Sequence, residues 1–198
     1  DDPLFEGPES IIVDLGAPTN ATLGIVPTHT YTITNNDTAP TVSFSIDATN
    51  GLESVTPVAL TVALSAASAL PVTAPFSVNL LSSALSPADY VVSTLSPLTF
   101  NPGDISKSIS ITITDDPLFE GPESIIVDLG APTNATLGAF PTHTYTITDN
   151  DSSPAVSFAI DATNGLESVT PATLTVSLSA VSALPVTAPF SVNLLSSA

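Results

Sequence analysis

The sequence predicts an all-β fold, an antiparallel β-sandwich with about seven strands in each unit. Three observations lead to this expectation. Apolar residues alternate with Ser and Thr along a series of short runs, which is the period of a strand with one buried face. The chain holds 19 Pro residues, and nearly all of them fall between these runs, where turns are expected. No stretch carries a helical stripe of useful length.

The first three expected strands alternate strictly. In residues 42–46, Val, Phe and Ile are separated by Ser. In residues 60–64, two Leu and one Val are separated by Thr and Ala. In residues 76–80, Phe, Val and Leu are separated by Ser and Asn. Each run therefore predicts one apolar face against a core and one polar, uncharged face toward solvent.

The later expected strands are longer. Residues 105–114 place four Ile and Lys107 on one face, with Ser and Thr on the other. Residues 125–129 follow, and residues 142–148 alternate His143, Tyr145 and an Ile with four Thr. Turn signals separate the runs: Asn50-Gly51, Ser86-Pro87, Asn101-Pro102-Gly103, Glu120-Gly121-Pro122 and Ala131-Pro132.

An internal repeat organises the chain. Residues 1–84 recur as residues 115–198 with 73 of 84 positions identical, so one unit is 114 residues long. We place the unit boundaries at the acidic segments TNNDTAP and TDNDSSP. This predicts the C-terminal part of one repeat in residues 1–37, a complete repeat in residues 38–151 and the N-terminal part of the next in residues 152–198.

Charge limits the classes of partner. The chain has 19 acidic residues and a single base, Lys107, which gives a net charge of −18. Such a surface repels nucleic acid and anionic lipid, and it attracts cations. No apolar run is long enough for a membrane-spanning helix, so we expect no direct membrane insertion in this stretch. Apolar residues make up 43% of the chain, which favours a folded protein over a disordered one.

Acidic residues are densest in the segment DDPLFEGPE. Asp115 and Asp116 end one expected strand, and Glu120 and Glu123 precede the next, so these carboxylates should gather at one pole of the sandwich. The segment TDND ends a later strand that should finish at the same pole. Carboxylates held together without Lys or Arg are the ligands that Ca²⁺ prefers. The alternative is a solvated acidic loop that keeps the protein soluble.

Five motifs follow one another along the chain: Asp89-Tyr90, the Asn-Pro-Gly turn, the Lys-Ser-Ile strand, the Glu-Gly-Pro-Glu corner and the closing Thr-Ile-Thr-Asp-Asn-Asp. This series resembles the Calx-beta repeat. The resemblance extends over residues 38–151 and both partial units. It implies an immunoglobulin-like β-sandwich. Members of that family form a cytosolic calcium sensor in sodium–calcium exchangers, and they occur in long arrays within extracellular adhesins of bacteria.

The resemblance adds Glu53 and Asp89 to the acidic positions and implies Ca²⁺ as the bound ion. The candidate metal ligands are Glu53, Asp89, Asp115, Asp116, Glu120, Glu123, Asp149 and Asp151 in the complete unit, and Asp1, Asp2, Glu6, Glu9 and Asp37 in the first copy. The first copy departs from this pattern, because Asn35 stands where the complete unit has Asp149. Metal sites of different units are therefore expected to differ in strength.

Catalysis has little support. The chain has no Cys, and it lacks an HExxH, a GxSxG and a Gly-rich phosphate loop. His29 and His143 occupy equivalent strand positions, where a structural role is expected. We therefore expect no enzymatic activity.

Three functions agree with these observations. The first is an extracellular, cell-surface rod in an adhesin or filament protein, in which Ca²⁺ at the acidic poles stiffens the junctions between neighbouring repeats. The second is a surface fibre whose subunits assemble with one another without metal. The third is a cytosolic calcium sensor, although nearly identical repeats are unlike a paired sensor. Persistence of filaments in EDTA would separate the first two.

Overall fold

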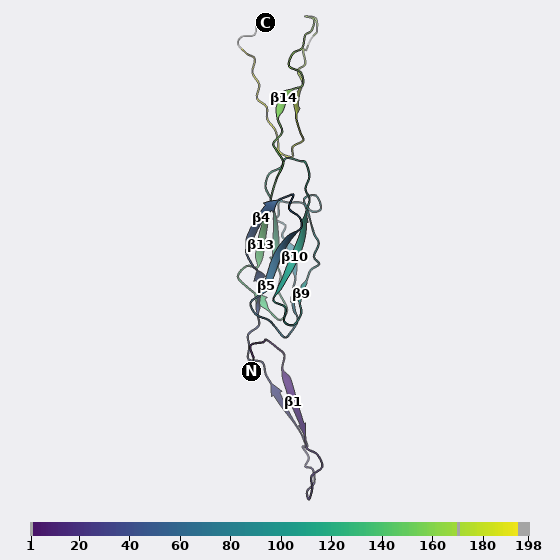
Figure 1. Cartoon of the computed structure of the whole chain (residues 1–198), viewed down its shortest axis with the longest axis vertical. Coiled ribbons are helices and arrows are strands. Elements are labelled where there is room, and N and C mark those ends of the chain that lie inside the picture. Colours follow the sequence, from purple (N-terminus) through teal and green to yellow (C-terminus); the bar gives the residue numbers. More distant parts are fainter. Residues whose placement is uncertain (1, 170, 194–198) are drawn as a thin grey trace.

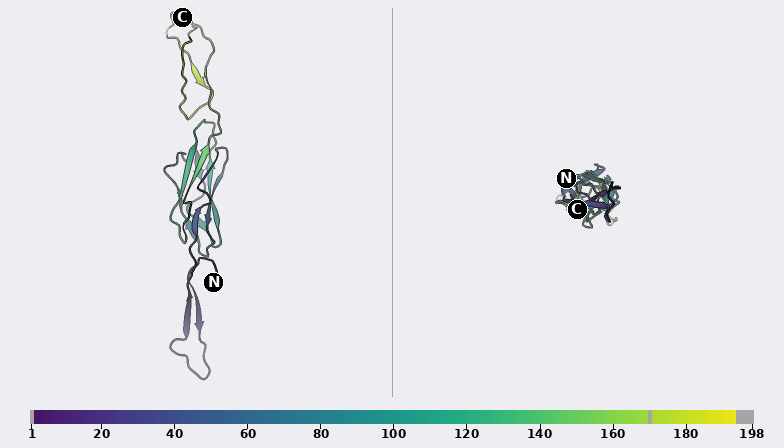
Figure 2. Two further views of the ribbon diagram at one scale, coloured as in Figure 1. Left: turned by 90° about the vertical axis from the view of Figure 1, so that its left-hand side faces the viewer. Right: turned by 90° about the horizontal axis from the view of Figure 1, so that it is seen from below.

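The computed structural model describes residues 2–169 and 171–193. The regular elements among them are β-strands that succeed one another along one long axis (Figure 1). A hairpin lies at one end, a two-layered sandwich in the middle and a short ribbon at the other end. Figure 2 shows the same slender outline after a quarter turn and a narrow cross-section end-on. The described part of the chain contains no helix with the length and hydropathy that crossing a membrane requires.

Two sheets form the sandwich. The first has five strands in the order β12 (Thr136–Leu137), β3 (Thr41–Phe44), β5 (Val58–Leu64), β10 (Ser106–Ile113) and β8 (Tyr90–Val92). The second has four strands in the order β4 (Ala48–Leu52), β13 (Thr142–Thr148), β11 (Glu123–Leu129) and β7 (Phe76–Val78). A small ribbon pairs β6 (Val72–Ala74) with β9 (Leu98–Phe100). The strands thus confirm the expected all-β sandwich, and two edge pairings, β12 with β3 and β4 with β13, are parallel rather than antiparallel.

The expected alternation builds the core. On β10, Ile109, Ile111 and Ile113 are at most 2% exposed, while Ser108 and Thr112, on the alternate positions, are exposed. On the facing sheet, β11 buries Ile125 and Val127 completely. Fully burying one such side chain stabilises the fold by about 1.5–3 kcal/mol. The alternation therefore fixes which face of each long strand turns inward.

Three strands are shorter in the structure than the alternation in the sequence predicts. Ile46, Leu80 and Ile105 were expected on buried faces, and they are 51%, 100% and 56% exposed. Strand β3 stops at Phe44 because the chain then leaves the first sheet to enter the second as β4. Strand β7 ends at Val78 because Asn79 begins a turn, in which its Oδ1 accepts the N–H of Leu81 at 2.9 Å.

The internal repeat is visible in strand pairing. Strands β1 (Glu9–Asp14) and β2 (Thr28–Ile33) pair with Val13 opposite His29, and β11 and β13 pair with Val127 opposite His143. The final ribbon joins β14 (Val156–Phe158) to β15 (Val176–Leu178), as β3 joins β5. The strands of both large sheets lie between residues 41 and 148. The boundaries of the complete unit at residues 38 and 151, and the tandem arrangement of whole domains, stay predictions.

Candidate metal centre

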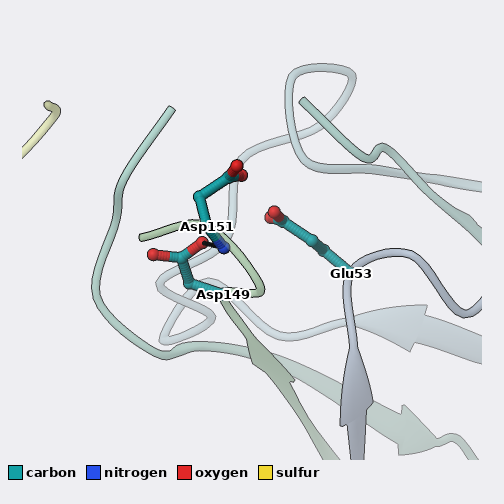
Figure 3. A group of neighbouring side chains, drawn as sticks. All are labelled: Glu53, Asp149 and Asp151. Atoms are coloured by element: carbon teal, nitrogen blue, oxygen red, sulfur yellow. Dashed lines mark hydrogen bonds between the residues drawn. The ribbon is translucent and has the colours of Figure 1, made fainter. Parts of the chain in front are cut away.

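One pole of the sandwich collects the acidic residues because several strands end or begin there. Strands β4 and β13 run parallel, so Glu53 after β4 and Asp149 after β13 leave the sheet side by side. The N–H of Glu53 donates to the carbonyl of Thr148 at 3.1 Å, which fixes this register. Glu53, Asp149 and Asp151 each place a carboxylate oxygen within 4.8 Å of the other two (Figure 3).

Burial makes this first trio unusual. Glu53 is only 4% exposed, although it is a carboxylate. Its Oε1 and the Oδ2 of Asp151 are buried without a hydrogen-bond partner among the described residues. A buried polar atom without a partner costs free energy, and a buried charge costs more unless it is paired or binds a metal. Figure 3 shows the Glu53 carboxylate pointing toward the two aspartates.

The electrostatics of the first trio follow from this arrangement. Burial and, next, the negative charge of Asp149 raise the pKa of Glu53 to about 7. Both causes disfavour the ionised carboxylate. A divalent cation between the carboxylates would remove the repulsion and favour ionisation.

A second trio lies at the same pole. Asp89, Glu120 and Glu123 also bring carboxylate oxygens within 4.8 Å of one another. Asp89 precedes β8, and its carbonyl accepts the N–H of Thr114 at 2.9 Å. This hydrogen bond holds the start of β8 beside the end of β10. Burial, followed by a hydrogen bond to Asp89 and the charge of that residue, raises the pKa of Glu123 to about 7. Burial also raises the pKa of Glu120, and the charges of Asp116, Asp89 and Asp149 add to the effect.

Backbone and side-chain hydrogen bonds join the two trios. The N–H of Glu120 donates to Asp149 Oδ2 at 2.8 Å, and the N–H of Asp151 donates to Asp149 Oδ1 at 2.7 Å. Asn150 Nδ2 donates to Asp115 Oδ1 at 3.2 Å. Asn150, which is not among the predicted ligands, thereby connects the turn after β13 to the corner after β10. The two trios therefore form one acidic pole.

No basic side chain neutralises this acidic pole. The single base of the chain, Lys107, places its Nζ 2.8 Å from Asp104 Oδ2. Asp104 belongs to neither trio, and its hydrogen bond with Lys107 holds the pKa of Asp104 below its usual value. His143 is buried among apolar residues, and its two ring nitrogens lie 2.8 Å from Thr49 Oγ1 and from the carbonyl of Ile46. This is the structural role expected for His143.

The remaining predicted ligands of the complete unit stay at the rim of the acidic pole. Asp115 and Asp116 are exposed. Asp115 is held by Asn150, and Asp116 Oδ1 accepts the N–H of Leu118 at 2.8 Å, which shapes the turn before Glu120. Neither is a member of a trio.

The first copy is arranged differently. Burial, and then the charges of Asp2, Glu9 and Asp37, raise the pKa of Glu6. Asn35 Oδ1 accepts the N–H of Asp37 at 3.0 Å, as Asp149 does for Asp151. Residues 2–37 nevertheless form no trio, because Glu53 and Asp89 have no counterparts among them. Asp1 lies outside the described residues.

The residues at the pole fit a hard divalent cation. Two groups of three carboxylates offer only oxygen, and two of these oxygens are buried without a partner. Calcium takes six to eight such ligands from carboxylates, carbonyls and water, whereas no soft ligand is available here for a thiophilic metal. The donor set therefore matches calcium on chemical grounds.

Comparisons with known proteins agree with this fold. The Calx-beta domain model matches residues 35–151. The crystal structures of CBD12 from CALX1.2 and of the calcium binding domain CBD12 of CALX1.1 are each 21% identical, with TM-scores of 0.52 over 65% of this chain. The apo-form Calx CBD1 domain is 20% identical, with a TM-score of 0.52 over 58% of this chain and all of that one.

The match to the two CBD12 structures covers 52% and 53% of their lengths, about half of each. No curated protein sequence matches this chain. The structural likeness at this level of identity establishes the fold, while the family match spans more than half of the residues. On that match, this chain belongs to the Calx-beta domain family.

Proposed function

We propose that this chain is a stretch of an extracellular structural rod, built of tandem Calx-beta domains and stiffened by Ca²⁺ at its acidic poles. The observation that carries the proposal is the pair of oxygen-only trios with two buried, unpartnered carboxylate oxygens. An ion bound there would connect the ends of β4 and β13 with the corner before β11. It would also hold Asp151, the residue that leads into the next segment.

The nature of the units supports a mechanical role. Copies that are identical at 73 of 84 positions suit a structure in which each unit does the same work as its neighbour. The long axis of the described chain passes through hairpin, sandwich and ribbon in sequence order (Figure 1). Extracellular calcium modules bind with Kd of about 0.1–1 mM, which suits tissue fluid or seawater rather than cytosol. The proposal assigns the chain no enzymatic activity and no nucleic-acid partner.

Thermal unfolding tests the proposal. We expect calcium at about 5 mM to stabilise the chain by about 1–2 kcal/mol relative to EDTA, since stabilisation grows as RT ln(1 + [Ca²⁺]/Kd). For a domain of this size, that corresponds to a rise in Tm of about 4–10 °C. The rise should disappear in Glu120→Ala. Equal Tm values in calcium and EDTA would leave the carboxylates as solvated surface.

A metal-independent self-assembling fibre is the second candidate. The contact between Phe119 and Ser182 shows that segments of this chain can join without any carboxylate. The edge strands β7 and β8 also leave backbone groups on which another chain could add a strand. Electron microscopy in EDTA separates the two candidates, because fibres that persist there support the second.

A further inference from the structure

The same backbone contact occurs at both ends of the sandwich. Phe5 forms an isolated parallel bridge with Ser68, and Phe119 forms one with Ser182. These pairs are 114 residues apart, so they are equivalent positions of the repeat. In each pair the Phe belongs to the acidic corner of one unit, and the Ser belongs to the unit that follows.

At the second junction, the Phe119 carbonyl accepts the N–H of Ala183 at 3.0 Å. The Ser182 hydroxyl lies 3.4 Å from this carbonyl and 3.0 Å from the carbonyl of Leu184, so its single proton is shared between the two. Ser182 Oγ also accepts the N–H of Leu184 at 3.1 Å, which fixes the local turn. A hollow across this junction is lined by Asp116, Pro117, Leu118, Ala180 and Val181.

The first junction brings together the equivalent residues. The Phe5 carbonyl accepts the N–H of Ala69 at 3.0 Å and the hydroxyl of Ser68 at 3.2 Å. Ser68 Oγ accepts the N–H of Leu70 at 3.0 Å. Ser68 is only 3% exposed, which is unusual for a serine in a loop and shows how closely the two segments approach.

Each partner in the contact has a locally fixed shape. Asp116 Oδ1 accepts the N–H of Leu118 at 2.8 Å, and Asp2 Oδ1 accepts the N–H of Leu4 at 3.0 Å. Such Asx turns hold the chain in a defined conformation immediately before each Phe. The serine turns fix the donor groups on the other side in the same way. Because both sides hold their conformation before they meet, docking costs less conformational entropy.

Strand directions make the contact head-to-tail. Strand β10 ends at Ile113, immediately before the corner that contains Phe119. Strand β5 runs antiparallel to β10, so it ends at the opposite pole, where Ser68 follows it. One unit therefore offers its carbonyl at one pole and its serine donors at the other.

We propose that successive units dock head to tail through this carbonyl clamp, with the next copy of the unit as the partner. The inference deepens the proposed rod and rests on it for the array, but the clamp itself contains no metal ligand. The clamp gives each junction a defined orientation, whereas a flexible linker would not. A complete unit would then contact the preceding unit at one pole and the following unit at the other.

The clamp is coupled to the acidic pole through the chain. Glu120 directly follows Phe119, and its N–H is held by Asp149 Oδ2 at 2.8 Å. Glu120 also belongs to the second carboxylate trio. Whatever fixes that trio therefore fixes the direction of the Phe119 carbonyl, so calcium at the pole would strengthen the clamp without forming part of it.

Amide hydrogen exchange on the full chain tests the clamp. We expect the N–H groups of Ala69 and Ala183 to exchange at least about tenfold more slowly than in an unstructured peptide, in calcium and in EDTA. In Ala183→Pro, which removes one donor, amide shifts should change over residues 116–121. Residues 2–7 at the intact first junction serve as the control in the same molecule. Residue 183 lies outside both sheets of the sandwich, so the sandwich amides should stay dispersed.

The outcomes separate the clamp from the calcium rod. Exchange of both amides at the peptide rate in either buffer overturns the clamp, even if calcium raises the Tm of the sandwich. Protection of both amides together with a calcium-independent Tm supports the clamp and removes the metal from the proposed function. Changes over residues 2–7 as large as those over residues 116–121 in Ala183→Pro would also contradict a local junction contact.

Discussion

The backbone N–H of Glu120 donates to Asp149 Oδ2 at 2.8 Å and thereby joins the two carboxylate trios at one pole of the sandwich. Burial is the main cause of the raised pKa of Glu123, and the negative charge of Glu53 in the other trio makes a smaller contribution. We therefore expect the acidic pole to respond as one unit, in which protons and divalent cations compete. This relationship leads to the first prediction.

Without divalent cations, stability should fall as pH rises from about 5 to about 8. The pKa values of Glu53 and Glu123 are raised to about 7 in the folded state, from an ordinary value of 4.5. Between these values the folded state binds more protons than the unfolded state, so the stabilisation is complete below the unfolded pKa. It is lost as pH passes through the folded pKa. Tm in EDTA across this range measures the effect.

Calcium should stabilise the folded chain more strongly as pH rises. The proposed site would bind Ca²⁺ through ionised carboxylates, so the apparent affinity should rise as pH passes through about 7. The difference in Tm between calcium and EDTA should therefore grow from pH 5 to pH 8. A Tm in EDTA that rises over this interval would contradict the protonation of the acidic pole.

Replacing Glu53 by Gln should separate repulsion from metal binding. The amide keeps the shape but removes the buried charge, so Tm in EDTA at pH 8 should not fall. The affinity for calcium should fall by at least about tenfold, because one carboxylate is lost. Glu167→Gln is the matched control, since Glu167 is the repeat counterpart of Glu53 and is exposed. An equal loss of calcium affinity in both variants would contradict the assignment of Glu53 as a calcium ligand.

His143→Ala should destabilise the sandwich by about 2–4 kcal/mol, measured by urea denaturation. The imidazole is 2% exposed, lies 5.4 Å from the Phe44 ring between centroids, and bonds to the carbonyl of Ile46 and to Thr49. The substitution leaves a cavity and unpaired polar groups. His29→Ala, at the exposed counterpart position, should change stability by less than about 0.5 kcal/mol.

Gly51→Ala should destabilise the chain by about 1–3 kcal/mol, because a Cβ there would collide with the Tyr145 hydroxyl. The cost should largely disappear in a Tyr145→Phe background, where that oxygen is absent. Gly165→Ala, at the repeat counterpart with open space around it, should have little effect. A penalty for Gly51→Ala that is equal in both backgrounds would show that the close approach of β4 and β13 is not its cause.

Much of the fold could be predicted from residue alternation. Ile109 and Ile111 on β10, and Ile125 and Val127 on β11, are buried as their two-residue period predicts. Alternation says nothing about where a strand leaves its sheet, so Ile46, which falls where the chain crosses between the sheets, was wrongly expected in the core. Parallel edge pairings are also invisible to it, because they depend on which distant strands meet.

The acidic pole could be predicted only in part. Glu120 and Glu123 are close in sequence, and the end of β13 places Asp149 at the same pole, so their proximity follows from strand order. The division into two trios, and the burial of Glu53, depend on the parallel pairing of β4 with β13. The junction of Phe119 with Ser182 has no charged or aromatic residue on its serine side, so the sequence pattern does not predict it.

A titration of the full chain with Ca²⁺, followed by amide chemical shifts, tests the central claim most directly. The account predicts saturable shifts with Kd of about 0.1–1 mM, centred on Glu53, Asp89, Glu120, Glu123, Asp149 and Asp151. These shifts should be lost in the double variant Glu53→Gln/Glu123→Gln and retained in Glu167→Gln. Shifts that do not saturate by about 10 mM, or that are spread evenly over all exposed carboxylates, would contradict a calcium site at the acidic pole.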